Sequence, residues 1–241
     1  MSAVFQYAGL PRAKEPGLSV EMCVERLHRL AYIEERLMFL QAVHIVTTPD
    51  RDLKGLLSRL QYEDGLHSDQ LKVRLTELRV AKKKAYKAPD ERLKLVFDEA
   101  MYSADRVELL AALVKVFKPA LLAAYQAYLN DTNGLADYPS VRIIRGIIAE
   151  EEEGIRLLEA AYQEVVGTAE QEAQAQRWAS TLQQLLSAVG GLDGTVETDV
   201  NEIRSERAQA PFRVARRPER DDTWVQLSYC EHKRSDLCGQ R

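Results

Sequence analysis

The sequence has few of the residues that cross-link small folds or form sulfur-ligated metal sites. It contains three cysteines, Cys23, Cys230 and Cys238, among 241 residues. Their spacing fits neither a paired metal-binding motif nor a disulfide framework. Cys23 falls on the apolar face of an expected helix, where a small buried residue is the usual interpretation. A disulfide-rich scaffold and a cysteine metal site are therefore excluded.

Long apolar runs and a strong charge of one sign are also missing. The chain has no run of about 18 apolar residues, and its N-terminus lacks the pattern of a secretory signal. The net charge of −4 at pH 7 gives no general reason to expect nucleic acid or an acidic membrane as a partner. We therefore expect a soluble, cytoplasmic protein without nucleic-acid or membrane partners. A homodimer, and a small-molecule substrate if the protein is an enzyme, remain open.

Aromatic residues make up only 7% of the chain, whereas alanine, leucine, glutamate and arginine are abundant, a balance that favours helices. No segment has a convincing strand pattern. Apolar periodicity and capping residues predict four long helices and one shorter one. Their expected ranges are 19–46, 52–80, 90–129 with a kink or end at Pro119, 140–166 and 168–190. The predicted fold class is all-α, an antiparallel four-helix bundle with a fifth helix, over residues 18–191.

The two ends of the chain are expected outside this bundle. Residues 1–17 form an N-terminal arm, and residues 192–241 an extended or disordered tail rich in arginine and proline. From about Ala208 onward, Phe212 and Trp224 are the only large anchors. The tail therefore either wraps the bundle or stays disordered, and we expect no part of it in the core.

The second predicted helix carries polar residues where its leucine stripe should continue. A helix turns by about 100° per residue, so each side chain can be assigned a direction. Asp64 and His67 occupy the two positions between Leu60 and Leu71 and lie within about 40° of the centre of the stripe. Both side chains are therefore predicted to face the bundle interior.

Each of the other long helices offers a carboxylate to the same interior. Glu34 and Glu151 fall near the centres of their apolar stripes, and Glu108 lies about 50° from the centre of its own. Other acidic residues are expected mainly in solvent or on outer faces: Glu35, Glu63, Asp98, Glu99, Asp105, Glu150, Glu152 and Glu153.

Four buried carboxylates with one imidazole would leave excess negative charge in a medium of low dielectric constant. Unpaired buried ions cost several kcal/mol each. Protonation relieves part of that cost, and a bound divalent cation relieves more. Oxygen ligands with one imidazole suit iron or manganese, so the sequence predicts one or two such ions.

This pattern resembles the ferritin-like superfamily, the carboxylate-bridged di-iron four-helix bundle proteins. The resemblance covers residues 18–166. It implies that Glu34 is the carboxylate of the first helix, that Asp64 and His67 match the Glu-x-x-His of the second, and that Glu108 and Glu151 are carboxylates of the third and fourth. Gly154 stands where a second histidine would be, which implies an open coordination position.

Two classes of function follow from the resemblance. In one, the cluster binds iron or manganese and activates oxygen or peroxide, as an oxidoreductase. In the other, the bundle is a degenerate, metal-free relative that acts as a structural or protein-interaction module, and Asp64 and His67 belong to an inert polar network.

Overall fold

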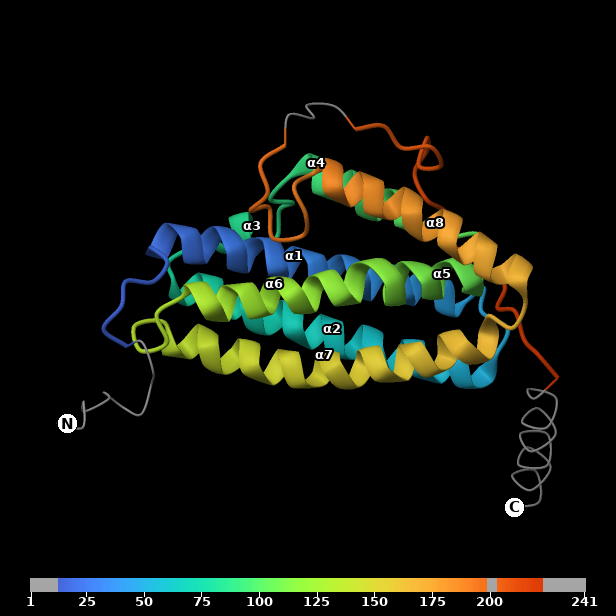
Figure 1. Cartoon of the computed structure of the whole chain (residues 1–241), viewed down its shortest axis with the longest axis horizontal. Helices are drawn as coiled ribbons and strands as arrows, with labels where there is room; N and C mark the ends of the chain where they lie inside the picture. The colour runs from blue at the N-terminus through green and yellow to red at the C-terminus, as the bar shows by residue number, and fades with distance from the viewer. Residues whose placement is uncertain (1–12, 199–202, 223–241) are drawn as a thin grey trace, which may run out of the picture.

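The computed structural model describes residues 13–198 and 203–222, and these ranges are all-α with no strand (Figure 1). Three groups of helices are separated by the long connection 78–105, which itself includes two short helices, and by the loop 132–137. The elements are α1 (Val20–Ile45), α2 (Arg51–Glu77), α3 (Lys82–Ala85), α4 (Glu91–Ala100), α5 (Arg106–Ala112), the π-helix η2 (Leu113–Phe117), α6 (Lys118–Asp131), α7 (Tyr138–Val165) and α8 (Ala169–Ala188).

Four helical segments form the bundle: α1, α2, the continuous α5–η2–α6, and α7 (Figure 1). The tight turn after α1 makes α1 and α2 antiparallel neighbours. Ion pairs connect the first turns of α2 and α5 through Asp50 and Arg106, and the start of α1 to the end of α6 through Arg26 and Asp131. Thus α1 and α7 run in one direction, while α2 and α5–η2–α6 run in the other.

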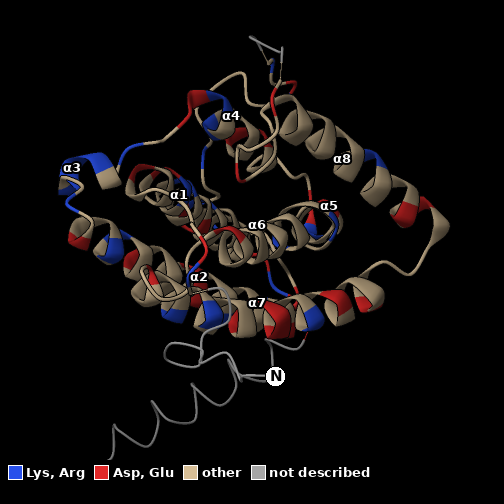
Figure 2. Cartoon of the chain, turned by 60° about the vertical axis from the view of Figure 1, so that its left-hand side comes forward, with Lys and Arg blue, Asp and Glu red and all other residues tan. Residues whose placement is uncertain are grey.

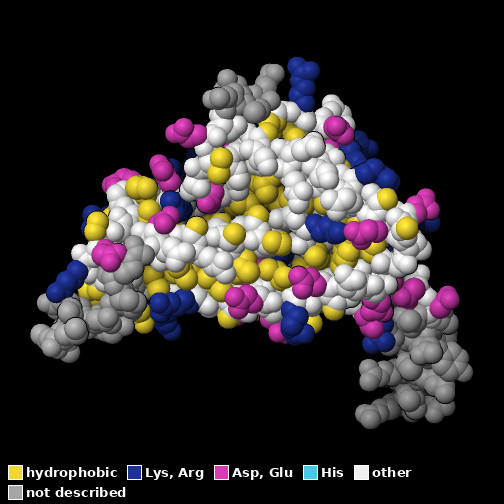
Figure 3. Space-filling model, viewed as in Figure 1, with side chains coloured by type: hydrophobic (Ala, Val, Ile, Leu, Met, Phe, Trp, Pro, Cys, Tyr) yellow, Lys and Arg dark blue, Asp and Glu magenta, His cyan; other side chains and the backbone are white. Residues whose placement is uncertain are grey.

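The connection from α2 to α5 is a long crossover that holds α3 and α4. The sequence of α3 is KKKA, and its lysines are exposed at the periphery of the molecule (Figure 2). Helix α4 packs with α8 in a second layer, and α8 also packs along α5. Figure 3 shows a hollow between the second layer, formed by α4 and α8, and the bundle below it, with hydrophobic side chains visible in the hollow.

The prediction of a continuous third helix over residues 90–129 is wrong in its middle. The chain breaks between α4 and α5, where Asp105 accepts hydrogen bonds from the backbone N–H groups of Val107 and Glu108 and so caps a new helix. Pro119, in contrast, does not end a helix, because it lies in the first turn of α6. Pro119 has no backbone N–H to donate. The π-helical turn before it accommodates this loss, because the Lys118 N–H donates to Leu113 O, five residues earlier.

The segment 203–222, named here the strap, lies along the bundle. Its residue Phe212 packs edge-on against Tyr102 and beside His44. Further along, the backbone N–H groups of Glu219 and Asp221 donate to Val46 O and Pro49 O in the α1–α2 turn. Phe212, one of the two large anchors expected in the tail, is half-buried and packs against the hydrophobic core. Trp224, Cys230 and Cys238 lie outside the described residues.

No helix in the described ranges combines the length and hydropathy needed to cross a membrane.

Candidate metal centre

Three helices of the bundle bring four ligand-type side chains to one buried point. Glu34 comes from α1, Asp64 and His67 from α2, and Glu151 from α7. One ligand-type atom from each lies within 4.8 Å of the others, and each residue is at most 2% exposed. These four were predicted from the apolar stripes, and the structure brings them together.

His67 connects this cluster to the surface. Its Nδ1 atom faces inward, 3.3 Å from Glu34 Oε1 and 3.6 Å from Glu151 Oε1. Its Nε2 atom lies 2.7 Å from the carboxylate of Glu150, which is exposed. A histidine that binds a metal commonly donates its other ring N–H to a carboxylate, which fixes the ring. His67 and Glu150 have the geometry for this arrangement.

The remaining bundle segment, α5–η2–α6, contributes a cation that was not predicted from the sequence. Lys118, the first residue of α6, is fully buried, and its Nζ lies 2.7 Å from Asp64 Oδ1 and 2.7 Å from Glu151 Oε1. The sequence did contain a signal. Lys118 begins the buried stripe of α6, which continues at Leu121, Ala124, Tyr125 and Tyr128, with the spacing of a core-facing helix.

Two neutral side chains complete the surroundings. Tyr125 donates its hydroxyl to Glu34 Oε1 at 2.6 Å, and Gln41 donates from Nε2 to Asp64 Oδ2 at 2.5 Å. Both residues are fully buried. Asp64 thus has a partner on each carboxylate oxygen, Lys118 on one and Gln41 on the other.

Four buried atoms of the cluster and of Gln41 have no hydrogen-bond partner among the residues described. They are Glu34 Oε2, Glu151 Oε2, His67 Nδ1 and Gln41 Oε1. Such orphaned buried atoms are uncommon, since an unmet polar atom costs about 1–3 kcal/mol. Two carboxylate oxygens and an imidazole nitrogen are the donor types that iron and manganese accept. The donor set therefore fits a bound divalent ion.

The electrostatics of the cluster are strongly perturbed. Burial raises the pKa of Asp64 to about 8, although Lys118 opposes this shift. Burial lowers the pKa of His67, but interaction with Glu151 and Glu34 outweighs it and raises the value to about 11. Burial also acts on Glu151, yet the charges of Lys118 and His67 prevail and lower its pKa. At neutral pH the metal-free cluster is thus neutralised by protons and by Lys118.

Glu108 was expected in this cluster and does not join it. It lies in the first turn of α5, where its carboxylate accepts from the backbone N–H of Ala104 and from both terminal nitrogens of Arg207 in the strap. The break before α5 changes the register of the stripe from which Glu108 was assigned, which explains the error. The segment α5–η2–α6 thus offers the cluster a lysine in place of a carboxylate.

Glu99 was expected on an outer face and is instead fully buried. The strap covers it, and its carboxylate accepts hydrogen bonds from the Ser205 hydroxyl and from the backbone N–H groups of Arg207 and Ala208. The guanidinium of Arg207 also lies 3.9 Å above the ring of Trp178. The buried carboxylates of Glu99 and Glu108 therefore find their partners in the strap and in nearby backbone rather than in a metal.

Gly154 does not leave an open position beside the cluster. It is buried in the contact between α7 and α2, and a Cβ atom there would lie 3.1 Å from Leu60 Cδ2. The glycine allows the two helices to approach each other closely. The expectation of a vacant coordination position at this residue is therefore wrong.

Five neighbouring acidic residues were expected to be mainly exposed, and the structure confirms this for two of them. Glu150 and Glu152 are exposed, whereas Glu35, Glu63 and Glu153 are half-buried. Glu35 points away from the cluster and pairs with Lys72 at 3.0 Å. The register of the first helix, with Glu34 rather than Glu35 inside, is thus confirmed.

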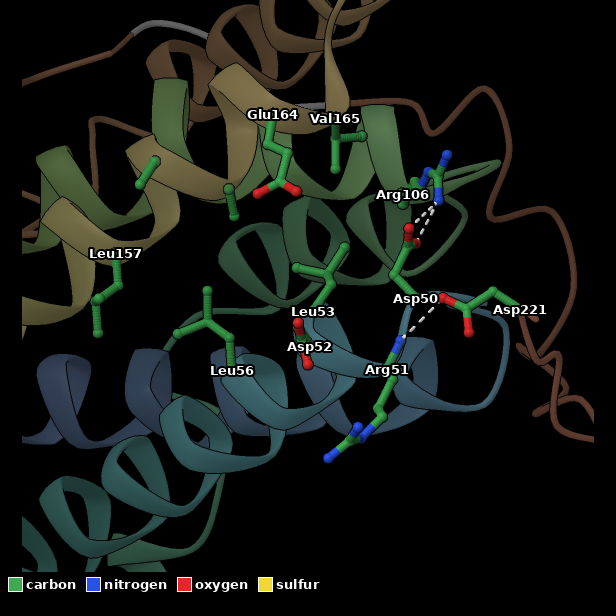
Figure 4. A pocket seen from close by; sticks show the side chains of 12 residues that line it. Asp50, Arg51, Asp52, Leu53, Leu56, Arg106, Leu157, Glu164, Val165 and Asp221 are labelled. Atoms are coloured by element: carbon green, nitrogen blue, oxygen red, sulfur yellow. Dashed lines mark hydrogen bonds and ion pairs between the residues drawn. The ribbon is translucent and has the colours of Figure 1, made fainter. Parts of the chain in front are cut away.

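A separate pocket of about 520 Å³ lies at the end of the bundle where α2 and α5 begin and α7 ends (Figure 4). Its polar rim includes Asp50, which pairs with Arg106, and Asp221, which accepts from the Arg51 N–H at 3.4 Å. Leu53 and Leu157 contribute to its apolar lining. None of the four cluster residues lines it, so we assign it no part in the metal centre.

Comparison with known proteins finds no family model, curated protein or solved structure that matches this chain. The fold and the site define an all-helical bundle with a buried carboxylate and histidine cluster that could bind a metal.

Proposed function

We propose that this protein is a ferritin-like metal-binding protein that holds iron or manganese in the Glu34, Asp64, His67 and Glu151 cluster and acts as an oxidoreductase toward oxygen or peroxide. The observation that carries the proposal is that Glu34, Asp64, His67 and Glu151 bring ligand-type atoms within 4.8 Å of one another. Three buried atoms of this cluster, Glu34 Oε2, Glu151 Oε2 and His67 Nδ1, also have no hydrogen-bond partner among the described residues. A divalent ion held in the cluster would satisfy donors of these types.

The direction of the helices supports the ferritin-like part of the proposal. Ferritin-like bundles have one long crossover between otherwise short connections. Here residues 78–105 form such a crossover, and the second and third bundle helices run in the same direction (Figure 1). The cluster lies in the centre of the bundle, on facing helices, as that class requires.

Iron or manganese, when bound, would supply the redox chemistry toward oxygen or peroxide. Glu34, His67 and Glu151 would hold the ion, and Glu150 would orient His67 by accepting its Nε2 proton. Tyr125 holds Glu34 through its hydroxyl. Leu37, Leu60 and Leu71, each about one helical turn from a cluster residue on its helix, are also buried.

A metal-free scaffold is the second candidate, and Lys118 favours it. The ammonium group of Lys118 already bridges Asp64 and Glu151 inside the cluster. With Asp64 and His67 both protonated, the two remaining carboxylates would be balanced by Lys118 and His67 without any metal. In this alternative the cluster fixes the packing of four helices, and the bundle serves as a structural or protein-interaction module.

Thermal unfolding with and without metal distinguishes the two. At 100 times its dissociation constant, an ion that binds only the folded state stabilises by about 2.7 kcal/mol. For a chain of this length, that corresponds to a rise in melting temperature of about 5–10 °C. We expect manganese or anaerobic ferrous iron to produce this rise in the wild type, and His67→Ala to remove most of it.

His44→Ala is the matched control. His44 is also buried, and its Nε2 lies 3.1 Å from Met101 O, away from the cluster. This variant should melt at a lower temperature but keep the metal-dependent rise. A wild type that melts at the same temperature with and without metal would support the metal-free scaffold.

A further inference from the structure

We propose that Lys118 occupies the place of a second metal ion and restricts the centre to one. The inference rests on the proposed function in taking the cluster to be a metal site. It adds the stoichiometry of that site and the residue that sets it.

The contacts of Asp64 show which half of the cluster is already occupied. One of its oxygens accepts from Lys118 Nζ and the other from Gln41 Nε2. Glu151 Oε1 accepts from the same Lys118 ammonium. Lys118 therefore bridges two carboxylates from facing helices, as a metal ion does in a carboxylate-bridged pair.

The other half of the cluster has no such cation. Glu34 Oε2, Glu151 Oε2 and His67 Nδ1 make no hydrogen bond to any described residue. Glu151 Oε1 contacts Lys118 and lies 3.6 Å from His67 Nδ1, while its Oε2 has no partner among the described residues. Glu151 therefore adjoins both Lys118 and His67 and is the residue shared by the two halves.

The charges of the cluster also balance with one ion. Glu34, Asp64 and Glu151 carry three negative charges when ionised. The ammonium of Lys118 and one divalent ion carry three positive charges, while a metal-bound His67 is neutral. A second divalent ion beside Lys118 would leave two excess positive charges in a buried site, where uncompensated charge is costly.

Local helix geometry places the ammonium group. The π-helical turn Leu113–Phe117 ends immediately before Lys118, and such turns occur often at functional sites. By adding a residue to the turn, it shifts the register so that Lys118, rather than a neighbour, begins the buried face of α6.

Manganese stoichiometry tests the inference. The full-length chain would be titrated with Mn²⁺, and free Mn²⁺ followed by electron paramagnetic resonance, for the wild type and for Lys118→Met. Methionine fills a similar volume but carries no charge. We expect one ion per chain in the wild type and two in the variant, because Asp64 and Glu151 lose their cation.

The possible outcomes separate this inference from the proposed function. One ion in both proteins would overturn the inference and leave the proposed function standing. No ion in the wild type and one in Lys118→Met would show that the lysine excludes every ion, which would refute the proposed function and overturn the inference of a one-ion centre. No ion in either protein would refute both.

Two further variants make the result independent of whether Lys118→Met folds without metal. The double variant Asp64→Asn with Lys118→Met removes one charge of each sign, so it should fold and bind one ion. Two ions in it would overturn the inference. Lys72→Met removes another buried lysine, which pairs with Glu35 away from the cluster, and it should still bind one ion.

Discussion

Replacing Lys118 with methionine is expected to lower the free energy of unfolding of the metal-free protein by about 3–5 kcal/mol. The substitution leaves Asp64 and Glu151 buried and without the ammonium that each contacts at 2.7 Å. Breaking a buried ion pair by removing one partner costs more than the pair itself contributes, because the remaining charge cannot be solvated. Urea unfolding followed by circular dichroism, in the presence of a chelator, measures the change.

The double variant Asp64→Asn with Lys118→Met provides the comparison for this prediction. Replacing both partners of a buried pair with neutral residues is often nearly neutral in stability. The double variant should therefore recover most of the lost free energy. If Lys118→Met alone is as stable as the wild type without metal, Lys118 does not balance the buried carboxylates.

Removing the strap is expected to have the next largest effect. A chain ending at Arg204 loses the hydrogen bonds that Ser205, Arg207 and Ala208 give to Glu99. Hydrogen bonds to a charged group contribute about 1.5–3 kcal/mol each, and water admitted by the deletion offsets part of the loss. We expect a fall of roughly 3 kcal/mol in the free energy of unfolding, measured by urea denaturation.

A chain ending at Arg217 is the control for this deletion. It keeps the residues that contact Glu99 and retains Phe212, but it loses the contacts of Glu219 and Asp221 with the α1–α2 turn. Its stability should lie much nearer to that of the full chain. Equal stability of all three chains would mean that the strap contributes nothing to the fold.

The residues of the candidate site that the sequence predicted lie on long, uninterrupted helices. Glu34, Asp64, His67 and Glu151 belong to α1, α2 and α7, each of at least 26 residues. On such helices, the angular position of a side chain follows from the positions of its apolar neighbours. The faces of these four residues could therefore be read directly from the leucine and isoleucine stripes.

The third bundle segment could not be predicted in the same way. Its stripe was extended across the break between α4 and α5, which gave Glu108 the wrong environment. The π-helical turn then changes the angular register before Lys118, so a stripe carried from α5 at about 100° per residue misplaces the side chains of α6. Lys118 can be placed only from the buried stripe of α6 itself. The burial of Glu99 was not predicted for another reason, because residues more than 100 positions later in the chain cover its side chain.

The most direct test of the account is the position of a metal ion in crystals of the full-length protein grown or soaked with Mn²⁺. Anomalous scattering at the manganese absorption edge locates the ion independently of the protein atoms. The account predicts one peak per chain, within about 2.5 Å of His67 Nδ1 and between Glu34 and Glu151, with Lys118 still bridging Asp64 and Glu151. Crystals saturated with Mn²⁺ that show no peak in this cluster would contradict it.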